Sequence, residues 1–157
     1  MKHEAIQVLM AFGGTFGFSV FFHIDKKKLI PVSIAGAFTW ILYLASRHLG
    51  ASEMLGLFLA SVASSIMAEV FARVMKAPST VFVIPILVPL IPGGNLYYTM
   101  SHLVLGDTEE FNTFLNLVLW EASSIALGVL VVLSLVHLIR QLESYFAKKS
   151  DLPQVKS

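Results

Sequence analysis

Long apolar runs separated by short polar stretches form the dominant pattern of this chain. Four runs are about as long as one membrane-spanning helix: residues 5–23, 29–46, 52–74 and 114–138. A hydrocarbon core of about 30 Å needs roughly 20 apolar residues in helical conformation. A further apolar region, about 78–105, is too long for one simple span. The pattern predicts an all-α integral membrane protein with about five transmembrane helices in a single domain, residues 1–145, followed by a polar cytoplasmic tail, residues 146–157.

The fourth apolar region carries helix breakers that interrupt its span. From 78 to 100 it reads PSTVFVIPILVPLIPGGNLYYTM, with three prolines followed by two glycines: Pro85, Pro89, Pro92, Gly93 and Gly94. Each proline removes the hydrogen bond to the carbonyl four residues earlier. Glycine admits backbone angles that other residues avoid. We therefore expect a fourth helix that is broken at this Pro/Gly motif.

The break predicts a second half-helix that begins at Gly94 or Asn95. Its first amides would point into the break, and the carbonyls of Val81, Pro85 and Val88 would lack their usual partners. Free amides and carbonyls at such a place can receive ions and carboxylates, as in many secondary transporters. A kinked packing helix is the alternative. The candidate substrate-binding residues are Pro89, Pro92, Gly93, Gly94, Asn95 and Tyr97, together with Arg73 from the third span.

Two acidic residues lie within apolar runs, where an unpaired carboxylate is costly. Glu69 shares a helix face with Ser61 and Ser65, and Arg73 follows at i+4, a spacing that allows an ion pair. The pair either fixes helix register or faces a water-filled path. Glu121 lies about two turns inside the last span. The candidate residues for proton coupling or for the solute path are Glu69, Glu121 and Ser124, the last on the same face as Glu121.

Small residues recur at intervals of four in two spans. Gly13 and Gly17 form a GxxxG pair in the first span. The third span carries a longer series of small residues: Gly56, Ala60, Ser64, Ala68 and Ala72. Such series let helix backbones approach closely. We expect both to be seams of helix packing.

Charge placement predicts the orientation. Charged residues make up 13% of the chain, against roughly 25% in soluble domains. With five crossings, nine Lys and Arg residues fall on one side and two on the other, Lys2 and Arg47. Because cytoplasmic loops are enriched in Lys and Arg, we expect a cytoplasmic C-terminus and an external N-terminus.

The net charge of +1 gives no reason to expect a nucleic-acid partner. Without cysteine or a metal or nucleotide motif, we expect no cofactor, no metal and no enzymatic activity.

The run AEVFARVMKAPSTVFVIPILVPLIPGGNLYYTM, Ala68 to Met100, resembles the threonine/serine exporter family. It is similar in particular to the small membrane subunit, or C-terminal half, of those exporters (the YjjB-like subunits). The resemblance implies secondary export of threonine and serine, or of dicarboxylates such as succinate, across the bacterial plasma membrane. It also implies a separate large exporter subunit as partner, with self-association as a further expectation. An assembly subunit, with the solute path in the partner chain, is the alternative function.

Overall fold

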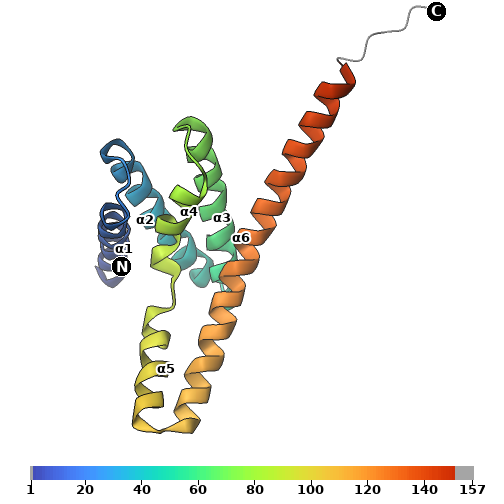
Figure 1. Ribbon diagram of the computed structural model, residues 1–157. Coiled ribbons are helices and arrows are strands. Elements are labelled where there is room, and N and C mark those ends of the chain that lie inside the picture. The colour runs from blue at the N-terminus through green and yellow to red at the C-terminus, as the bar shows by residue number, and fades with distance from the viewer. Residues whose placement is uncertain (1, 151–157) are drawn as a thin grey trace, which may run out of the picture.

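The computed structural model of the chain describes the backbone of residues 2–150 and the side chains of residues 3–145. That part is helical throughout, apart from short connections (Figure 1). The elements are α1 (Lys2–Phe21), α2 (Lys26–His48), α3 (Glu53–Val74), α4 (Thr80–Leu87), the 3₁₀ turn η1 (Val88–Leu90), α5 (Gly93–Leu105) and α6 (Thr108–Ser150). The predicted all-α class is confirmed.

Four helices are long and apolar enough to cross a membrane, namely α1, α2, α3 and α6. The α4–η1 segment and α5, which correspond to the fourth apolar region, are long and apolar enough only when taken together, and they are bent by 67° relative to each other. The predicted break in the fourth apolar region is therefore confirmed, and the region forms two helical segments on either side of it. The helices α1 to α4 pack beside one another, whereas α5 and the first part of α6 form a hairpin that projects beyond them (Figure 1).

The helix α3 packs through the small residues that the sequence pattern singles out. On the side facing α2, the hydroxyls of Ser64 and Thr39 lie 3.0 Å apart, and both residues are fully buried. Ala68 belongs to a buried cluster with Phe82 of α4. A Cβ atom on Gly56 would lie 2.8 Å from the Ser46 hydroxyl of α2. The predicted seam of the third span is therefore confirmed.

A second face of α3 packs against α6. A Cβ atom at Gly128 of α6 would lie 2.0 Å from the Ser61 hydroxyl and 2.8 Å from the Phe58 carbonyl oxygen. Ser61 and Ser65 are buried, and their hydroxyls donate to carbonyls of their own helix. These internal hydrogen bonds let polar residues line a close helix contact in an apolar environment.

The prediction for α1 is wrong within the single chain. Cβ atoms placed on Gly13 and Gly17 would meet nothing within 4 Å. The packing face of α1 is instead the buried stripe Ala11, Thr15 and Ser19, directed towards α2. Thr15 approaches Gly36 of α2 so closely that a Cβ there would lie 2.1 Å from its hydroxyl. The hydroxyls of Thr15 and Ser19 donate to carbonyls one turn back, which allows their burial.

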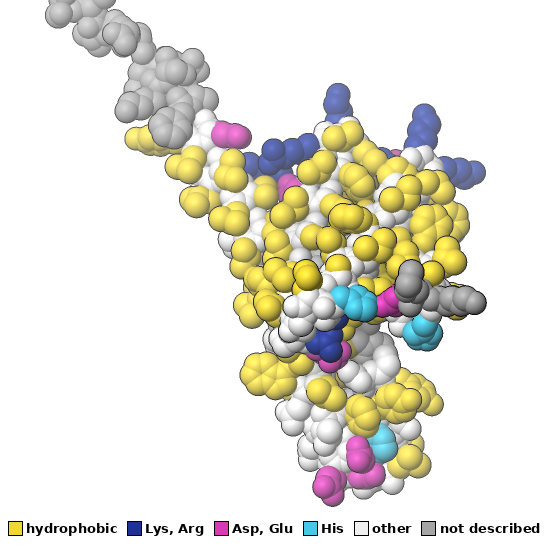
Figure 2. Space-filling model, turned by 180° about the vertical axis from the view of Figure 1, so that it is seen from behind, with side chains coloured by type: hydrophobic (Ala, Val, Ile, Leu, Met, Phe, Trp, Pro, Cys, Tyr) yellow, Lys and Arg dark blue, Asp and Glu magenta, His cyan; other side chains and the backbone are white. Residues whose placement is uncertain are grey.

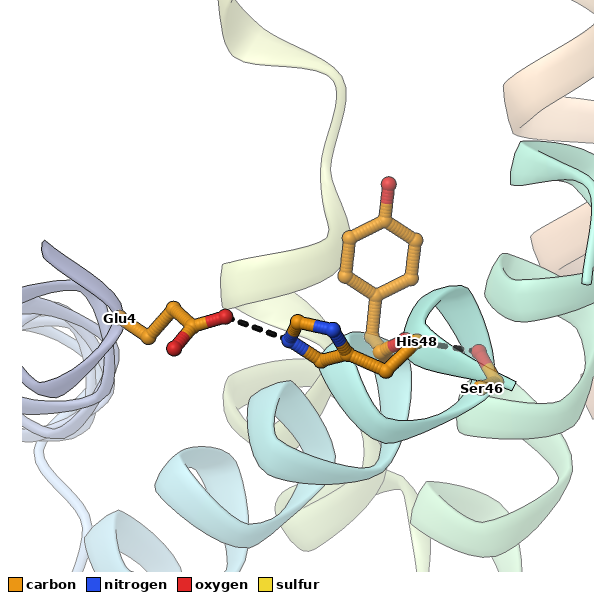
Figure 3. Close-up of polar contacts among 4 residues, drawn as sticks. Glu4, Ser46 and His48 are labelled. Atoms are coloured by element: carbon orange, nitrogen blue, oxygen red, sulfur yellow. Dashed lines mark hydrogen bonds and ion pairs between the residues drawn. The ribbon is translucent and has the colours of Figure 1, made fainter. Parts of the chain in front are cut away.

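Polar contacts join the helix ends. The carboxylate of Glu4 on α1 contacts the ring of His48 at the end of α2, beside the Ser46 hydroxyl, which donates to the Tyr43 carbonyl at 2.7 Å (Figure 3). At the other end of the bundle, Lys28 pairs with Asp25 at 2.9 Å. The hydrogen bond from Lys28 holds the pKa of the Asp25 carboxyl below its ordinary value.

The two ends of the molecule differ in charge. Most visible Lys and Arg side chains gather at one end, and Asp and Glu side chains gather at the tip of the α5–α6 hairpin (Figure 2). The segregation agrees with the charge pattern of the sequence. The direction in which the protein sits in the membrane stays a prediction.

The last helix is longer than the predicted span of residues 114–138. At 1.5 Å per residue, the 43 residues of α6 extend about 65 Å, roughly twice the hydrocarbon thickness. The helix also continues through the first residues of the expected polar tail. The remainder of that tail, residues 151–157, lies outside the described residues.

The α3–α6 contact predicts a specific sensitivity at Gly128. The substitution Gly128→Ala should destabilise the protein by about 1–3 kcal/mol, because the new methyl group overlaps Ser61 and a backbone carbonyl. Thermal unfolding of the purified protein in detergent measures this. The control is Gly14→Ala, where a methyl group meets nothing within 4 Å and a helix-favouring residue replaces glycine. Equal midpoints for the two variants would contradict the packing argument.

Candidate functional site

The break between α4 and α5 is built by the prolines of the fourth span. The helix α4 tightens into the 3₁₀ turn η1, and the chain becomes extended at Ile91. The Val88 amide donates to the Pro85 carbonyl, and the Ile91 amide donates to the Val88 carbonyl at 3.2 Å. The carbonyls of Pro85 and Val88 therefore lack their usual donors four residues ahead, as expected, but they are not free to bind a ligand. The 3₁₀ geometry gives each a donor three residues ahead in place of the one that proline removes.

The amino end of α5 keeps two unused donors. The helix begins at Gly93, one residue before the predicted start, and the Gly93 amide donates to the Ile91 carbonyl at 2.7 Å. The first helical hydrogen bond runs from the Leu96 amide to the Pro92 carbonyl. Between them, the amides of Gly94 and Asn95 donate to no acceptor among the described residues. These amides lie at the positive end of the α5 dipole.

The space beside these amides is open. A Cβ atom at Gly93 or at Gly94 would meet nothing within 4 Å, and both glycines are exposed. Neither glycine has a positive φ angle. No turn here requires glycine. The effect of having glycine at both positions is that no side chain covers the backbone amides.

A buried carboxylate lies at the same end of α5. The Asn95 side-chain amide donates to Oε1 of Glu121 on α6 at 2.7 Å. Glu121 is only 4% exposed, and its second oxygen, Oε2, is buried without a hydrogen-bond partner in the described chain. One helix terminus thus holds two free amide donors and one unused carboxylate oxygen. An arrangement of this kind can hold an anionic group and a cationic or protonated group side by side.

The other predicted site residues make contacts outside this group. Pro89 lines a separate cavity of about 270 Å³ with Gln7 and Trp40. Tyr97 is 69% exposed, and its ring contacts Tyr98. The hydroxyl of Ser124 donates to the carbonyl one turn back, that of Trp120.

Glu69 and Arg73 belong to the opposite end of the bundle. Leu57 of α3 packs with Leu90, next to the break, and Glu69 lies 12 residues further along α3. That separation is about 18 Å along the helix axis. The structure therefore does not bring Arg73 to the amides of α5.

Glu69 pairs with a residue that sequence reasoning missed. Nη2 of Arg140 on α6 donates to Oε2 of Glu69 at 2.9 Å, and Glu69 is buried. The predicted pair with Arg73 is wrong, because Glu69 faces α6, whereas Arg73 is exposed and has no ion pair in the described chain. Arg140 was detectable only as the first basic residue after the last apolar run.

Comparison with known proteins identifies the family to which the chain belongs. A family model described as "Threonine/Serine exporter, ThrE" matches residues 7–135. The chain belongs to the threonine/serine exporter family. The match includes the break, Asn95, Glu69 and Glu121, and ends before Arg140. No curated protein and no solved structure gives a significant match.

Membership of this exporter family indicates membrane transport and agrees with the expectation that the chain is not an enzyme. The helices that are long and apolar enough to span a membrane fit this role. Among the residues that the structure describes, no group of three or more His, Asp or Glu side chains is arranged to hold a metal ion.

The hydrogen bond between Asn95 and Glu121 predicts a loss of stability when the amide is removed. In the exporter variant Asn95→Ala, the Glu121 carboxylate has no protein donor, which should cost about 1–3 kcal/mol. Chemical unfolding in detergent, followed by tryptophan fluorescence, measures the change. Asn112→Ala, at an exposed position of α6, is the control and should leave the midpoint unchanged. Adding Glu121→Ala to Asn95→Ala should recover part of the loss, and a purely additive pair would refute the contact.

Proposed function

We propose that this chain is the membrane subunit of a two-component secondary exporter, and that it binds its solute at the break between α4 and α5. The observation that carries the proposal is the unpartnered Oε2 atom of Glu121, buried at the helix end where the amides of Gly94 and Asn95 are also free. Buried polar groups are normally satisfied, so the unpartnered Oε2 atom of Glu121 calls for a ligand, and the two free amides at the same helix end offer it donors.

The chemistry of these groups matches a zwitterionic α-amino acid. The two amides and the positive end of the α5 dipole suit the carboxylate of the solute. The Oε2 atom of Glu121 suits its ammonium group, through a charge-assisted hydrogen bond. A dicarboxylate such as succinate would bring a second negative charge towards Glu121. The site therefore favours threonine and serine over dicarboxylates as substrates.

The open side of the site supports a partner subunit. Gly93 and Gly94 are exposed, and α5 packs extensively only against α6. A binding site for a polar solute in a membrane has to be enclosed, because irregular backbone at that depth is tolerated only in protein or beside water. The large exporter subunit implied by the sequence resemblance, or a second copy of this chain, would provide that cover.

Direction and coupling complete the proposal. With the basic end at the cytoplasm of a bacterial plasma membrane, Glu69 and Arg140 lie near the cytoplasmic face, and Glu121 lies towards the outside. Glu121 is the candidate for proton coupling, because a carboxylate that binds an ammonium group can instead bind a proton. In this arrangement Glu69 belongs to the path on the cytoplasmic side.

An assembly subunit remains the second candidate function. It is favoured by the apolar surface of the α5–α6 hairpin, where Tyr97, Val104 and Trp120 are at least 65% exposed. A surface of this kind suits contact with lipid or with another subunit. In that case the solute path would lie in the partner chain, and the groups at the break would be structural.

Transport assays separate the two functions. With the large subunit present in proteoliposomes, Glu121→Gln should reduce threonine export about tenfold or more, because a charge-assisted hydrogen bond to the solute is lost. Gly94→Ala should also reduce export, since its methyl group enters the open space beside the free amides without a clash. Glu110→Gln, the same change at an exposed acid of the hairpin tip, should export at the wild-type rate.

Complex formation is measured in parallel by co-purification of the two chains. The transport site requires Glu121→Gln and Gly94→Ala to assemble normally while export is lost. Wild-type export by both variants would eliminate the site and leave the assembly function. Export that persists in full after a protonophore abolishes the proton gradient would eliminate proton coupling.

A further inference from the structure

A second group of unused polar groups lies at the basic end of the bundle, around Arg140. Two cavities share Ser79 and Arg140 in their linings, one of about 440 Å³ and one of about 300 Å³. The larger also contacts Glu69, Leu133 and Val136, and the smaller contacts Arg73 and Thr80. The Arg140 side chain therefore borders both cavities at the surface of the bundle.

The donors around these cavities exceed the acceptors. Arg140 is 57% exposed and uses one nitrogen for Glu69, while Arg73 has no acceptor in the described chain. The Ser79 side chain makes no capping hydrogen bond, and the Thr80 amide at the start of α4 has no acceptor. Two guanidinium groups, a hydroxyl and a helix amino end thus face one region, which suits a phosphate or carboxylate group.

The surroundings of the larger cavity favour a phospholipid as the source of that group. The helices α4 and α6 both pack on α3 and make no extended contact with each other, which leaves the cavity between them. On the side of α6 that carries Arg140, the exposed residues Leu133 and Leu130 follow at seven and ten residues, about 10 and 15 Å along the helix. A headgroup at the arginines would therefore place an acyl chain along an apolar stripe.

We propose that Arg140, Arg73 and the amino end of α4 form a binding site for the phosphate of an anionic phospholipid at the basic face of the protein. Basic pockets between membrane helices bind such headgroups, and each Lys or Arg near the surface strengthens the attraction. Glu69 is the internal competitor, because its carboxylate occupies one edge of the Arg140 guanidinium. This site is separate from the break: Glu121 and Arg140 lie 19 residues apart on α6, about 28 Å.

The experiment measures lipid binding by the full-length purified chain. Phosphatidylglycerol or phosphatidylcholine is titrated into detergent solution, and bound lipid is counted by native mass spectrometry with thermal unfolding in parallel. Wild-type protein should retain phosphatidylglycerol in preference to phosphatidylcholine. Glu69→Gln should bind phosphatidylglycerol more tightly than wild type, because it frees Arg140 and removes a negative charge.

The arginines are tested without leaving Glu69 buried and unpaired. The double variant Glu69→Gln/Arg140→Gln and the single variant Arg73→Gln should each lose roughly fivefold in phosphatidylglycerol affinity relative to their parents. Arg47→Gln is the control. Arg47 lies in the last turn of α2, away from the basic end of the bundle, and donates to the Ala51 carbonyl. It should bind as the wild type does.

Three outcomes would overturn the proposal. The first is unchanged phosphatidylglycerol binding in both arginine variants, and the second is equal retention of the two lipids by the wild type. The third concerns the source of the anion. Inorganic phosphate or succinate, added at the same concentration, should protect the protein less than phosphatidylglycerol does, and equal protection would assign the site to a free anion.

Discussion

Hydrocarbon offers polar groups no hydrogen bonds, and the cost of leaving such groups unpaired shapes each irregular feature of this chain. Buried hydroxyls such as that of Thr15 donate to carbonyls of their own helix. Glu69 has Arg140. The carbonyls of Pro85 and Val88, which lose their usual donors to proline, accept from the Val88 and Ile91 amides. At the amino end of α5, by contrast, the free amides of Gly94 and Asn95 and the unused oxygen of Glu121 occur together.

The two polar sites share a framework. The helix α3 packs on α2 and α4 through one face and on α6 through another, and contacts between α3 and α6 occur at both Gly128 and Arg140. Glu121 and Arg140 are carried by the same unbroken helix. The exporter chain therefore combines an open binding end near the break with a basic end that holds a buried acid, and it connects them through one rigid element.

The sequence was sufficient for features that depend on local chemistry. Hydrophobic run length predicts the spans, and the loss of an amide hydrogen at proline predicts the break before Gly93. Contacts between helices were harder to predict from the sequence. The i, i+4 spacing of Glu69 and Arg73 describes one helix only, and the true partner, Arg140, lies 71 residues away. Likewise, the GxxxG spacing of Gly13 shows that a helix can approach that face, but in the described chain none does so.

The close contact of Gly128 with Ser61 forms a pivot point for α6. Glu121 lies seven residues to one side of Gly128 and Arg140 twelve residues to the other, about 10 and 18 Å along the axis. A tilt of the helix about this point moves the two ends in opposite directions, and the Arg140 end travels nearly twice as far. Because α5 packs on α6 rather than on the bundle, a force on the projecting hairpin acts on the part of α6 that carries Glu121 and strains the contact between Arg140 and Glu69 on the other side of Gly128.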